Sequence, residues 1–220
     1  MKKKVIPALL LIAMVLVAAG CGAYMLDRYN ILPKIPFSGE RFGIERLYSP
    51  ADGDGDGVDD YTDMTETARA YIATRPEYKS AYYAGGYPPE GEGVSTDVIW
   101  KAFAGAGYDL KAMVDADIAA APEAYPAITK PDPNIDFRRV RNLKIFFERH
   151  AQVLTCDIND ISQWQAGDVV VFAKGHIGIV SDKRDFWGHT WIIHHGSGNG
   201  AEEDAISRDK VTGHYRWIAE

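Results

Sequence analysis

The stretch GEGVSTDVIWKAFAGAG, residues 91–107 of this 220-residue chain, decides the fold class. A loop broken by glycines leads into Ser95 and Thr96, and an apolar run follows at helical spacing. We expect a helix from about Ser95 to Ala106, with Gly107 as its natural stop. Its buried face consists of Val98, Ile99, Ala102, Phe103 and Ala106. The helix must therefore pack against a core, and its first residue is a serine.

Ser95 has two interpretations from its position alone. Serine is a common helix cap, because its hydroxyl accepts a hydrogen bond from a backbone N–H of the first turn. A serine there is also placed to act as a nucleophile, since the helix dipole favours a developing anion and free N–H groups can stabilise an oxyanion. The histidines downstream bear on this choice.

The remaining periodicity predicts an α+β fold. Further helices are expected in 61–75, 110–120 and 139–151, where helix formers continue without an internal proline or glycine. After Gln163 the pattern changes to short β-branched and aromatic runs divided by turns. These runs, expected to form a small antiparallel sheet, are residues 167–175, 176–183, 190–196 and 213–219.

The first 21 residues, MKKKVIPALLLIAMVLVAAGC, have the composition of an export signal. The sequence AAGC resembles the lipobox of bacterial lipoproteins, in which the cysteine is lipidated; an ordinary secretory signal is the alternative. We therefore expect a signal peptide in 1–20, a tether in 21–50 and one domain in 51–220. Lipidated Cys21 would hold the exported protein at the cell membrane, within the cell envelope.

Composition excludes some partners. The formal charge is −7, and loss of the three lysines of the signal makes it more negative. The one basic cluster is FRRVRNLK, so nucleic acid is not an expected partner. If Cys21 is lipidated, Cys156 is the one remaining thiol and no intrachain disulfide can form. Cys156 lies in a loop-like stretch, which does not indicate a nucleophile.

The segment DGDGDGVDDYTD, residues 52–63, has the spacing of a calcium loop. Gly57 is at position 6 of the loop, where the chain turns sharply. Asp59 is at position 8, which is apolar in the EF-hand type of calcium loop. The pattern is therefore closer to the thrombospondin type 3 calcium repeat, with a solvated acidic linker as the alternative. Bound Ca²⁺ would supply stability that disulfides do not. The expected ligands are the side chains of Asp52, Asp54, Asp56, Asp60 and Asp63 and the carbonyl of Val58.

Three histidines fall on two expected strands. In HIGIV, His176 shares a face with Gly178 and Val180. In IIHH, His194 and His195 point to opposite faces, so one of them at most can meet His176. A residue at a helix start, facing a histidine that a second polar group orients, is the arrangement of acyl-transfer enzymes. A structural role for each of these residues remains the alternative.

The motifs in their order resemble the bacterial domain of unknown function 1287, across residues 50–218. They include GEGVSTDVIW, PDPNIDFRRVRNLK, QAGDVVVF, HIGIVSDKR, IIHHG, EED and GHYR. That family is placed with the NlpC-type superfamily of papain-like cell-wall peptidases. The resemblance implies an NlpC-like α+β fold, with a nucleophile helix packed on a five- or six-stranded sheet. It also implies His176 as base and His194 as the group that orients it, with His195 as the alternative orienter.

The chain departs from the family at the nucleophile position. Where the family pattern is GVCTDV, this chain has GVSTDV, so Ser95 stands in place of cysteine. A thiol ionises far more readily than a serine hydroxyl, which must lose its proton to the base during attack. Nearby Asp97 would oppose an anion at residue 95 if it lies close.

Other residues have weaker functional interpretations. Tyr82, Tyr83 and Tyr87 precede the helix, either to help hold an oxyanion or to pack. Arg138 and Arg139 would bind a carboxylate of an acidic peptide, or form a surface ion pair with Asp136 or Glu148. His214 is expected to be structural.

Three functions follow as alternatives. The first is a hydrolase or amidase that cleaves peptidoglycan stem peptides by acyl transfer at Ser95. The second is a silent relative that binds such peptides. The third is a cysteine peptidase in which the cysteine was replaced by engineering. Substrate identity rests on the resemblance, because a fold does not fix a function.

Overall fold

Six antiparallel strands form the central sheet, in the order β3-β8-β4-β5-β6-β7. The computed structural model describes residues 5–28, 34–196 and 198–219. The strands are β3 (Gln152–Val153), β4 (Val169–Phe172), β5 (His176–Arg184), β6 (Thr190–His195), β7 (Gly200–Glu203) and β8 (Val211–Arg216). A separate parallel pair is formed by β1 (Glu77–Tyr78) and β2 (Glu92–Gly93). The expected α+β class is therefore confirmed.

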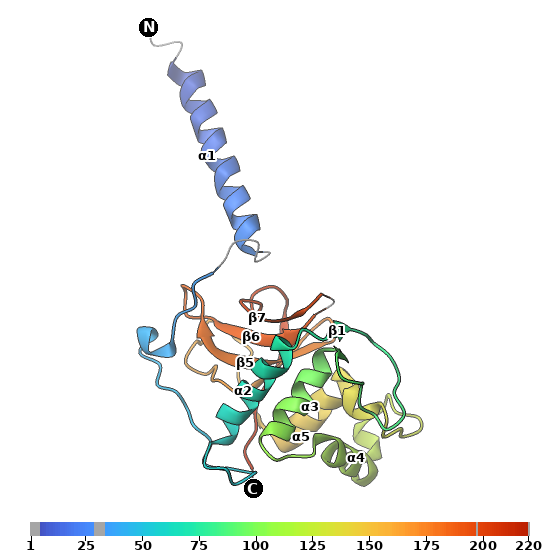
Figure 1. Ribbon diagram of the computed structural model, residues 1–220. Coiled ribbons are helices and arrows are strands. Elements are labelled where there is room, and N and C mark those ends of the chain that lie inside the picture. Colours follow the sequence, from blue (N-terminus) through green and yellow to red (C-terminus); the bar gives the residue numbers. More distant parts are fainter. Residues whose placement is uncertain (1–4, 29–33, 197, 220) are drawn as a thin grey trace. The chain divides into compact units, whose positions relative to one another are not determined.

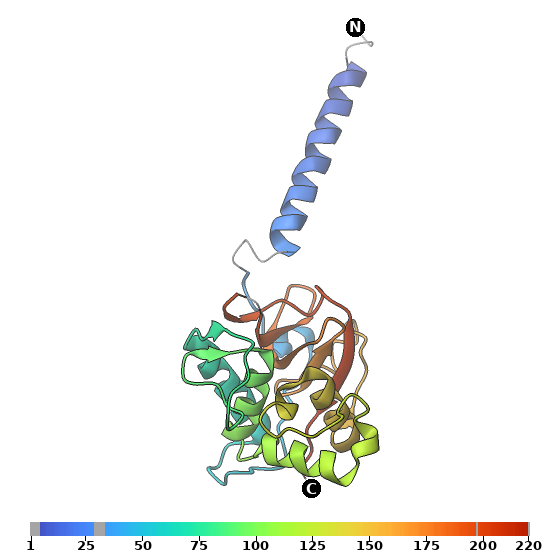
Figure 2. The ribbon, with the colours of Figure 1, turned by 90° about the vertical axis from the view of Figure 1, so that its right-hand side faces the viewer.

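The α-helices of this region are α2 (Asp60–Ala73), α3 (Ser95–Gly105), α4 (Leu110–Ala120) and α5 (Val140–His150). Short 3₁₀ turns lie at η2 (Gly39–Phe42), η3 (Pro122–Ala124) and η4 (Asp136–Arg138). The four helices occur where the sequence predicts them. Figures 1 and 2 show α2 and α3 side by side along the sheet, and both helices contact β5 and β6.

The sheet is buried on both faces. Its helix face carries Val169, Val171, Ile177, Ile179 and Ile193, which join one core with Val98, Ile99 and Phe103 of α3. Its second face carries Val170, Phe172, Val180 and Ile192, which pack with Trp164, Ile206 and Val211. Because successive strand residues point to opposite faces, burial of both faces fixes the register of every strand.

The chain divides into two units, Met1–Ile35 and Pro36–Glu220. In the first, helix α1 (Val5–Arg28) contains a segment, Leu9–Leu26, that is long and apolar enough to cross a membrane. A signal sequence meets the same description. Cys21 is exposed on this helix.

The folded unit starts earlier than residue 51. Residues 36–50, which the sequence assigns to the tether, belong to the Pro36–Glu220 unit. Phe37 exchanges two backbone hydrogen bonds with Arg184 of β5, at 2.9 and 2.8 Å. Ile44 is buried. These contacts have no periodicity, so the sequence pattern alone does not show them.

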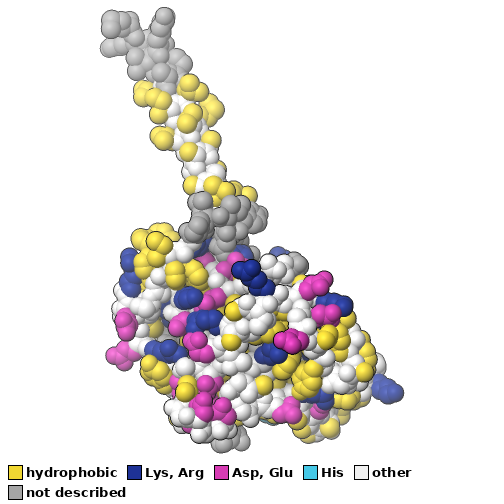
Figure 3. Space-filling model, viewed as in Figure 1, with side chains coloured by type: hydrophobic (Ala, Val, Ile, Leu, Met, Phe, Trp, Pro, Cys, Tyr) yellow, Lys and Arg dark blue, Asp and Glu magenta, His cyan; other side chains and the backbone are white. Residues whose placement is uncertain are grey.

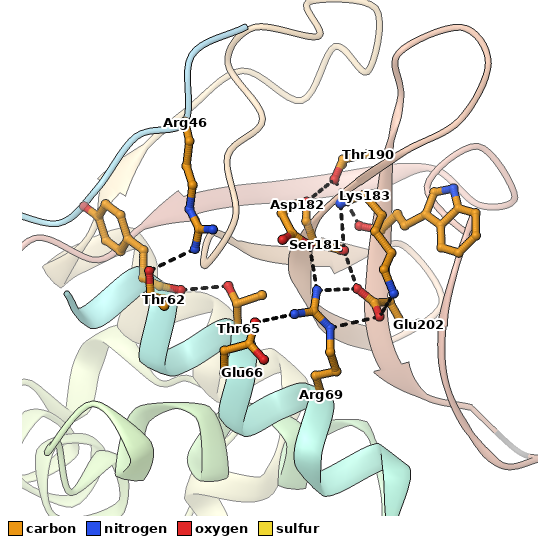
Figure 4. A network of polar contacts seen from close by, with 12 residues as sticks. Arg46, Thr62, Thr65, Glu66, Arg69, Ser181, Asp182, Lys183, Thr190 and Glu202 are labelled. Carbon is orange, nitrogen blue, oxygen red and sulfur yellow. Dashed lines mark hydrogen bonds and ion pairs between the residues drawn. The ribbon is translucent and has the colours of Figure 1, made fainter. Parts of the chain in front are cut away.

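A polar cluster fastens α2 to the sheet (Figure 4). Arg69 of α2 donates to both carboxylate oxygens of Glu202 on β7, at 3.0 and 2.7 Å, and to Asp182 of β5 at 2.6 Å. Lys183 Nζ contacts Glu202 Oε2 at 2.6 Å. Burial alone would raise the pKa of Glu202, but hydrogen bonds from Arg69, Lys183 and Ser181 lower it to about 2.

This cluster predicts acid sensitivity. The pKa of folded Glu202 is below its ordinary value of 4.5, so its stabilisation is present above about pH 4.5 and is lost as pH falls towards about 2. We expect Glu202→Gln to lower the free energy of unfolding at pH 7 by up to about 3 kcal/mol, the lower end for a buried pair, because Arg69 is partly exposed. Urea unfolding between pH 2 and 7 measures both effects.

Glu66→Gln is the matched control. Glu66 also pairs with Arg69 but is mostly exposed, so we expect a change below about 1 kcal/mol. If the free energy of unfolding depended equally on pH in the wild type and in Glu202→Gln, Glu202 would not be the source of the acid sensitivity.

Candidate functional site

Ser95 is the first residue of α3, and it is not the residue that caps the helix. Val94 is the N-cap residue, and its backbone N–H donates to Asp97 Oδ2 at 2.7 Å. Asp97 therefore supplies the capping carboxylate, and the interpretation of Ser95 as a plain cap is wrong. Ser95 is 7% exposed, and among the described residues its hydroxyl makes no hydrogen bond. The first N–H groups of a helix lack the usual acceptor four residues earlier, and the Asp97 N–H donates to the Val94 carbonyl at 3.0 Å.

A buried ion pair fixes the start of α3. Arg138 Nε and Nη2 donate to the two oxygens of Asp97 at 2.8 and 2.9 Å, and both side chains are almost fully buried. Trp100 Nε1 adds a hydrogen bond to Asp97 at 2.7 Å. The expected pairing of Arg138 with Asp136 or Glu148 is therefore wrong. Because Arg138 balances the charge of Asp97, that carboxylate does not simply oppose an anion at Ser95.

The structure brings His176 and His194 together. His176 Nε2 lies 2.9 Å from His194 Nδ1, and His194 Nε2 lies 3.1 Å from Glu203 Oε1. Arg208 Nη1 donates to the same Glu203 oxygen at 2.6 Å. We call His176, His194 and Glu203 the histidine relay.

The relay assigns the ring protons of a neutral histidine pair. Ionised Glu203 can only accept, so His194 Nε2 carries a hydrogen and its Nδ1 is the acceptor. His176 Nε2–H then donates to His194, and the lone pair of His176 lies on Nδ1. Burial, followed by the neighbouring His194 and His195 rings, lowers the pKa of His176 to about 4. His176 is therefore neutral at pH 7, as a general base must be.

Gly178 makes room for this contact. A Cβ at this position would lie 2.6 Å from Ile192 Cγ2 and 3.2 Å from His194 Cβ. Any side chain would displace the strand that carries His194. The glycine of the HIGI motif thus allows β6 to pack closely enough for His194 to contact His176.

The histidine relay and Ser95 lie on opposite faces of the sheet. Strand alternation places His176 and His194 with Val180 and Ile192, on the face opposite α2 and α3. His195 lies with Ile193 on the helix face. Burial lowers the pKa of His195, and the negative charge of Asp97 partly offsets this effect. Hydrogen bonds with the backbone of Pro76 and Gly198 also act in the direction opposite to burial and raise the pKa of His195. Within the described residues, no hydrogen bond joins Ser95 to any histidine.

The three tyrosines before α3 have other partners. Tyr83 donates to Glu92 at 2.7 Å, Asn134 donates to the Tyr82 hydroxyl at 2.9 Å, and Tyr87 packs on Trp100 and Phe137. These contacts favour the packing interpretation.

Three further residues named from the sequence make no contact with the histidine relay among the described residues. Arg139 and Cys156 are exposed. Partial desolvation of its sulfur atom still raises the pKa of the Cys156 thiol. His214 is buried, stacks on Trp164 and contacts Asp168 at 2.9 Å, as a structural residue does.

Sequence reasoning missed Glu203 and Tyr71. The signal for Glu203 was the EED motif, but β7 is too short and polar to be recognised as a strand. Tyr71 of α2 packs against Gly93, where an added Cβ would overlap its hydroxyl. No local pattern links residues 71 and 93, so this contact needs the three-dimensional fold.

Three of the five expected carboxylates of the acidic loop converge. One oxygen each of Asp52, Asp54 and Asp56 lies within 4.8 Å of the others, and all three side chains are exposed. Asp52 accepts backbone hydrogen bonds from Gly55 and Gly57, which curl the loop. Gly57 has φ +95, a conformation that favours glycine.

The two remaining carboxylates behave differently. Asp63 Oδ2 is buried without a partner among the described residues, and burial with the nearby Asp56 and Asp54 raises the Asp63 pKa to about 6. Asp60 is fully buried and instead accepts from the Gly53 N–H at 2.8 Å and the Tyr108 hydroxyl at 2.6 Å. Several carboxylates and one unsatisfied oxygen fit a hard divalent cation. Asp60 is not part of the converging group.

Comparison with known proteins places the chain in a family. The family model described as "Domain of unknown function (DUF1287)" matches residues 65–217. The chain is 36% identical over 166 residues to "Uncharacterized protein YijF" of Escherichia coli (strain K12), covering 70% of this chain and 80% of that protein. No solved structure matches. The chain therefore belongs to the DUF1287 family.

The Asp97–Arg138 pair generates a stability prediction. Either single variant, Asp97→Leu or Arg138→Met, leaves an unpaired buried charge, and we expect each to cost about 3–5 kcal/mol of the free energy of unfolding. The double variant removes both charges, so it should be more stable than either single variant. Chemical denaturation of the four proteins measures the coupling, and additive losses would contradict the pairing.

Proposed function

We propose that this protein is an NlpC-like hydrolase or amidase of the cell envelope that cleaves peptidoglycan stem peptides by acyl transfer at Ser95. Ser95 Oγ attacks the peptide carbonyl while His176 Nδ1 accepts the hydroxyl proton, and His194 holds the imidazole. This step requires peptide binding to bring Ser95 and His176 within hydrogen-bond reach, because strand alternation places His176 on the sheet face opposite α3. The proton then passes to the leaving amine, and water hydrolyses the acyl ester. The histidine relay is the observation that carries this proposal.

The relay suits a serine nucleophile. A thiolate–imidazolium pair needs a charged histidine, whereas serine needs a neutral base at the moment of attack. The lowered pKa of His176 keeps the ring neutral, and it also weakens the ring as a proton acceptor, because a general base works best with a pKa near the operating pH. The Arg138 charge beside Asp97 also reduces the electrostatic cost of an anion at the start of α3.

The location is part of the same proposal. An apolar N-terminal segment that ends in AAGC supports export and a lipid anchor at Cys21. The domain would then act where peptidoglycan is present. The choice of stem peptides rests on the resemblance to cell-wall peptidases.

Peptide binding without hydrolysis is the second candidate. It is favoured by the placement of His176 and His194 on the face opposite α3 and by the absence of a Ser95–histidine hydrogen bond in the described residues. In that case, the domain would bind the peptide without completing a triad.

Variants at residue 95 separate these functions. We expect wild type to hydrolyse purified muropeptides and Ser95→Ala to lose at least about 10³-fold in rate, since the nucleophile is absent. Chromatography measures hydrolysis, and calorimetry measures binding by each variant. Activity confined to Ser95→Cys would support a silenced or engineered cysteine site. Unchanged hydrolysis by Ser95→Ala excludes Ser95, and binding without cleavage by wild type supports the second candidate.

The identity of the base has its own test. We expect His176→Gln to lose about as much activity as Ser95→Ala, because the two residues act as a unit. His195→Gln is the competing variant, since this ring lies on the helix face of the sheet, on the side of α3, where the charge of Asp97 acts on it. A loss with His195→Gln and none with His176→Gln would reverse the assignment.

We also propose that Ca²⁺ binds the acidic loop through Asp52, Asp54, Asp56 and Asp63, with the Val58 carbonyl as a further ligand. The cation would offset repulsion among these carboxylates. It would join the loop to the start of α2, which begins at Asp60.

Metal removal tests this site. At Ca²⁺ a hundredfold above its Kd, binding adds about 2.7 kcal/mol, so a chelator should lower the melting temperature by several degrees. We expect Asp56→Asn to weaken this effect and Glu123→Gln, an exposed control outside the loop, to retain it. An identical melting temperature with and without chelator rules the site out.

A further inference from the structure

Exposed aromatic side chains gather at one end of the Pro36–Glu220 unit. Phe186 and Trp187, in the turn between β5 and β6, are 61% and 73% exposed. The Phe186 ring lies 6.4 Å from Phe37 and 5.2 Å from Trp187. The Arg41 guanidinium lies 4.0 Å above the Phe37 ring and 5.8 Å from the Phe186 ring. We call Phe37, Arg41, Phe186 and Trp187 the aromatic patch.

The patch is not part of a core. Neither buried cluster of the unit includes these four residues. Figure 3 shows hydrophobic side chains gathered with basic ones at the upper left of the unit, where Figure 1 shows the β5–β6 turn and η2. An exposed tryptophan and phenylalanine at the tip of a turn cost solvation free energy that another contact can recover.

The patch lies where the chain enters the unit. Phe37 is the second residue of Pro36–Glu220, and α1 ends at Arg28. Nine residue steps span at most about 30 Å when fully extended. A domain of this length is roughly 40 Å across. If α1 stays in the bilayer, these nine steps keep the membrane within about 30 Å of Phe37, and if Cys21 is the lipidated N-terminus, sixteen steps allow about 55 Å.

We propose that the aromatic patch inserts into the interface of the bilayer that anchors the N-terminal segment. Tryptophan and phenylalanine with a neighbouring basic residue have the chemistry of an interfacial anchor. This second contact would limit the rotation of the domain on its tether. It does not depend on the reaction at Ser95.

Electrostatics indicates which force drives the contact. The chain carries a formal charge of −7, so an anionic surface repels it as a whole. Arg41 is the basic member of the patch, and the aromatic rings provide its apolar area. Binding should therefore change little between low and high salt, unlike that of a polybasic segment.

Quenching of tryptophan fluorescence by brominated lipid tests the contact. The full chain is reconstituted into phosphatidylcholine vesicles with and without bromine on the acyl chains. Of the five tryptophans, Trp164, Trp191 and Trp217 are buried, while Trp187 is highly exposed. We expect brominated lipid to reduce the emission of the wild type, and Trp187→Phe to lose most of that reduction. Trp100→Phe, which removes a half-buried ring of α3, should keep it.

Three results would overturn the proposal. Equal quenching in the wild type and Trp187→Phe would mean that Trp187 stays in water. A blue shift of Trp187 emission that grows with protein concentration without lipid would assign the patch to a second copy of the chain. Failure of the chain to sediment with vesicles would reject the anchor and the patch together. Loss of muropeptide activity alone would leave this proposal intact.

Discussion

The alternation of β5 and β6 is the constraint on which the rest of the structure depends. Ile177, Ile179 and Ile193 must face the helices, because they complete the core with α2 and α3. Their neighbours His176 and His194 must then face the other way, where they meet each other at 2.9 Å. A shift of one residue would bury the wrong side chains on both faces of the sheet. The core thus determines which histidines form the relay.

Two electrostatic arrangements prepare the candidate site. At the start of α3, the Asp97–Arg138 pair supplies the helix cap and leaves the Ser95 hydroxyl without a structural partner. At the end of the sheet, Glu203 sets the tautomers through which His176 would act as a base. Serine in place of cysteine is compatible with a neutral His176, which connects the substitution at residue 95 to the environment of the base. The separation of the two arrangements across the sheet is the reason why hydrolysis and binding remain distinct candidates.

Much of the fold could be predicted from periodicity, and less of the site. The helices and the long strands were predicted because apolar residues recur at 3.6 or 2 positions. β3, β7 and the segment 36–50 were missed. β3 has two residues and β7 has four without a large apolar side chain, and the segment 36–50 has no regular period. The pairing of His176 with His194 followed from the family resemblance, whereas Glu203 and the partner of Arg138 depend on contacts between distant residues. The acidic loop could be predicted locally because its ligands are consecutive, yet burial of Asp60 could not.

The protonation state of His176 decides whether this ring can act as the base. Long-range ¹H–¹⁵N spectra of the labelled chain at pH 7, assigned with His176→Gln, distinguish the two tautomers and the imidazolium. We expect a neutral ring protonated at Nε2, with Nδ1 free to accept a proton. A ring protonated at Nδ1, or an imidazolium at this pH, would contradict the relay and with it the role of His176 as base.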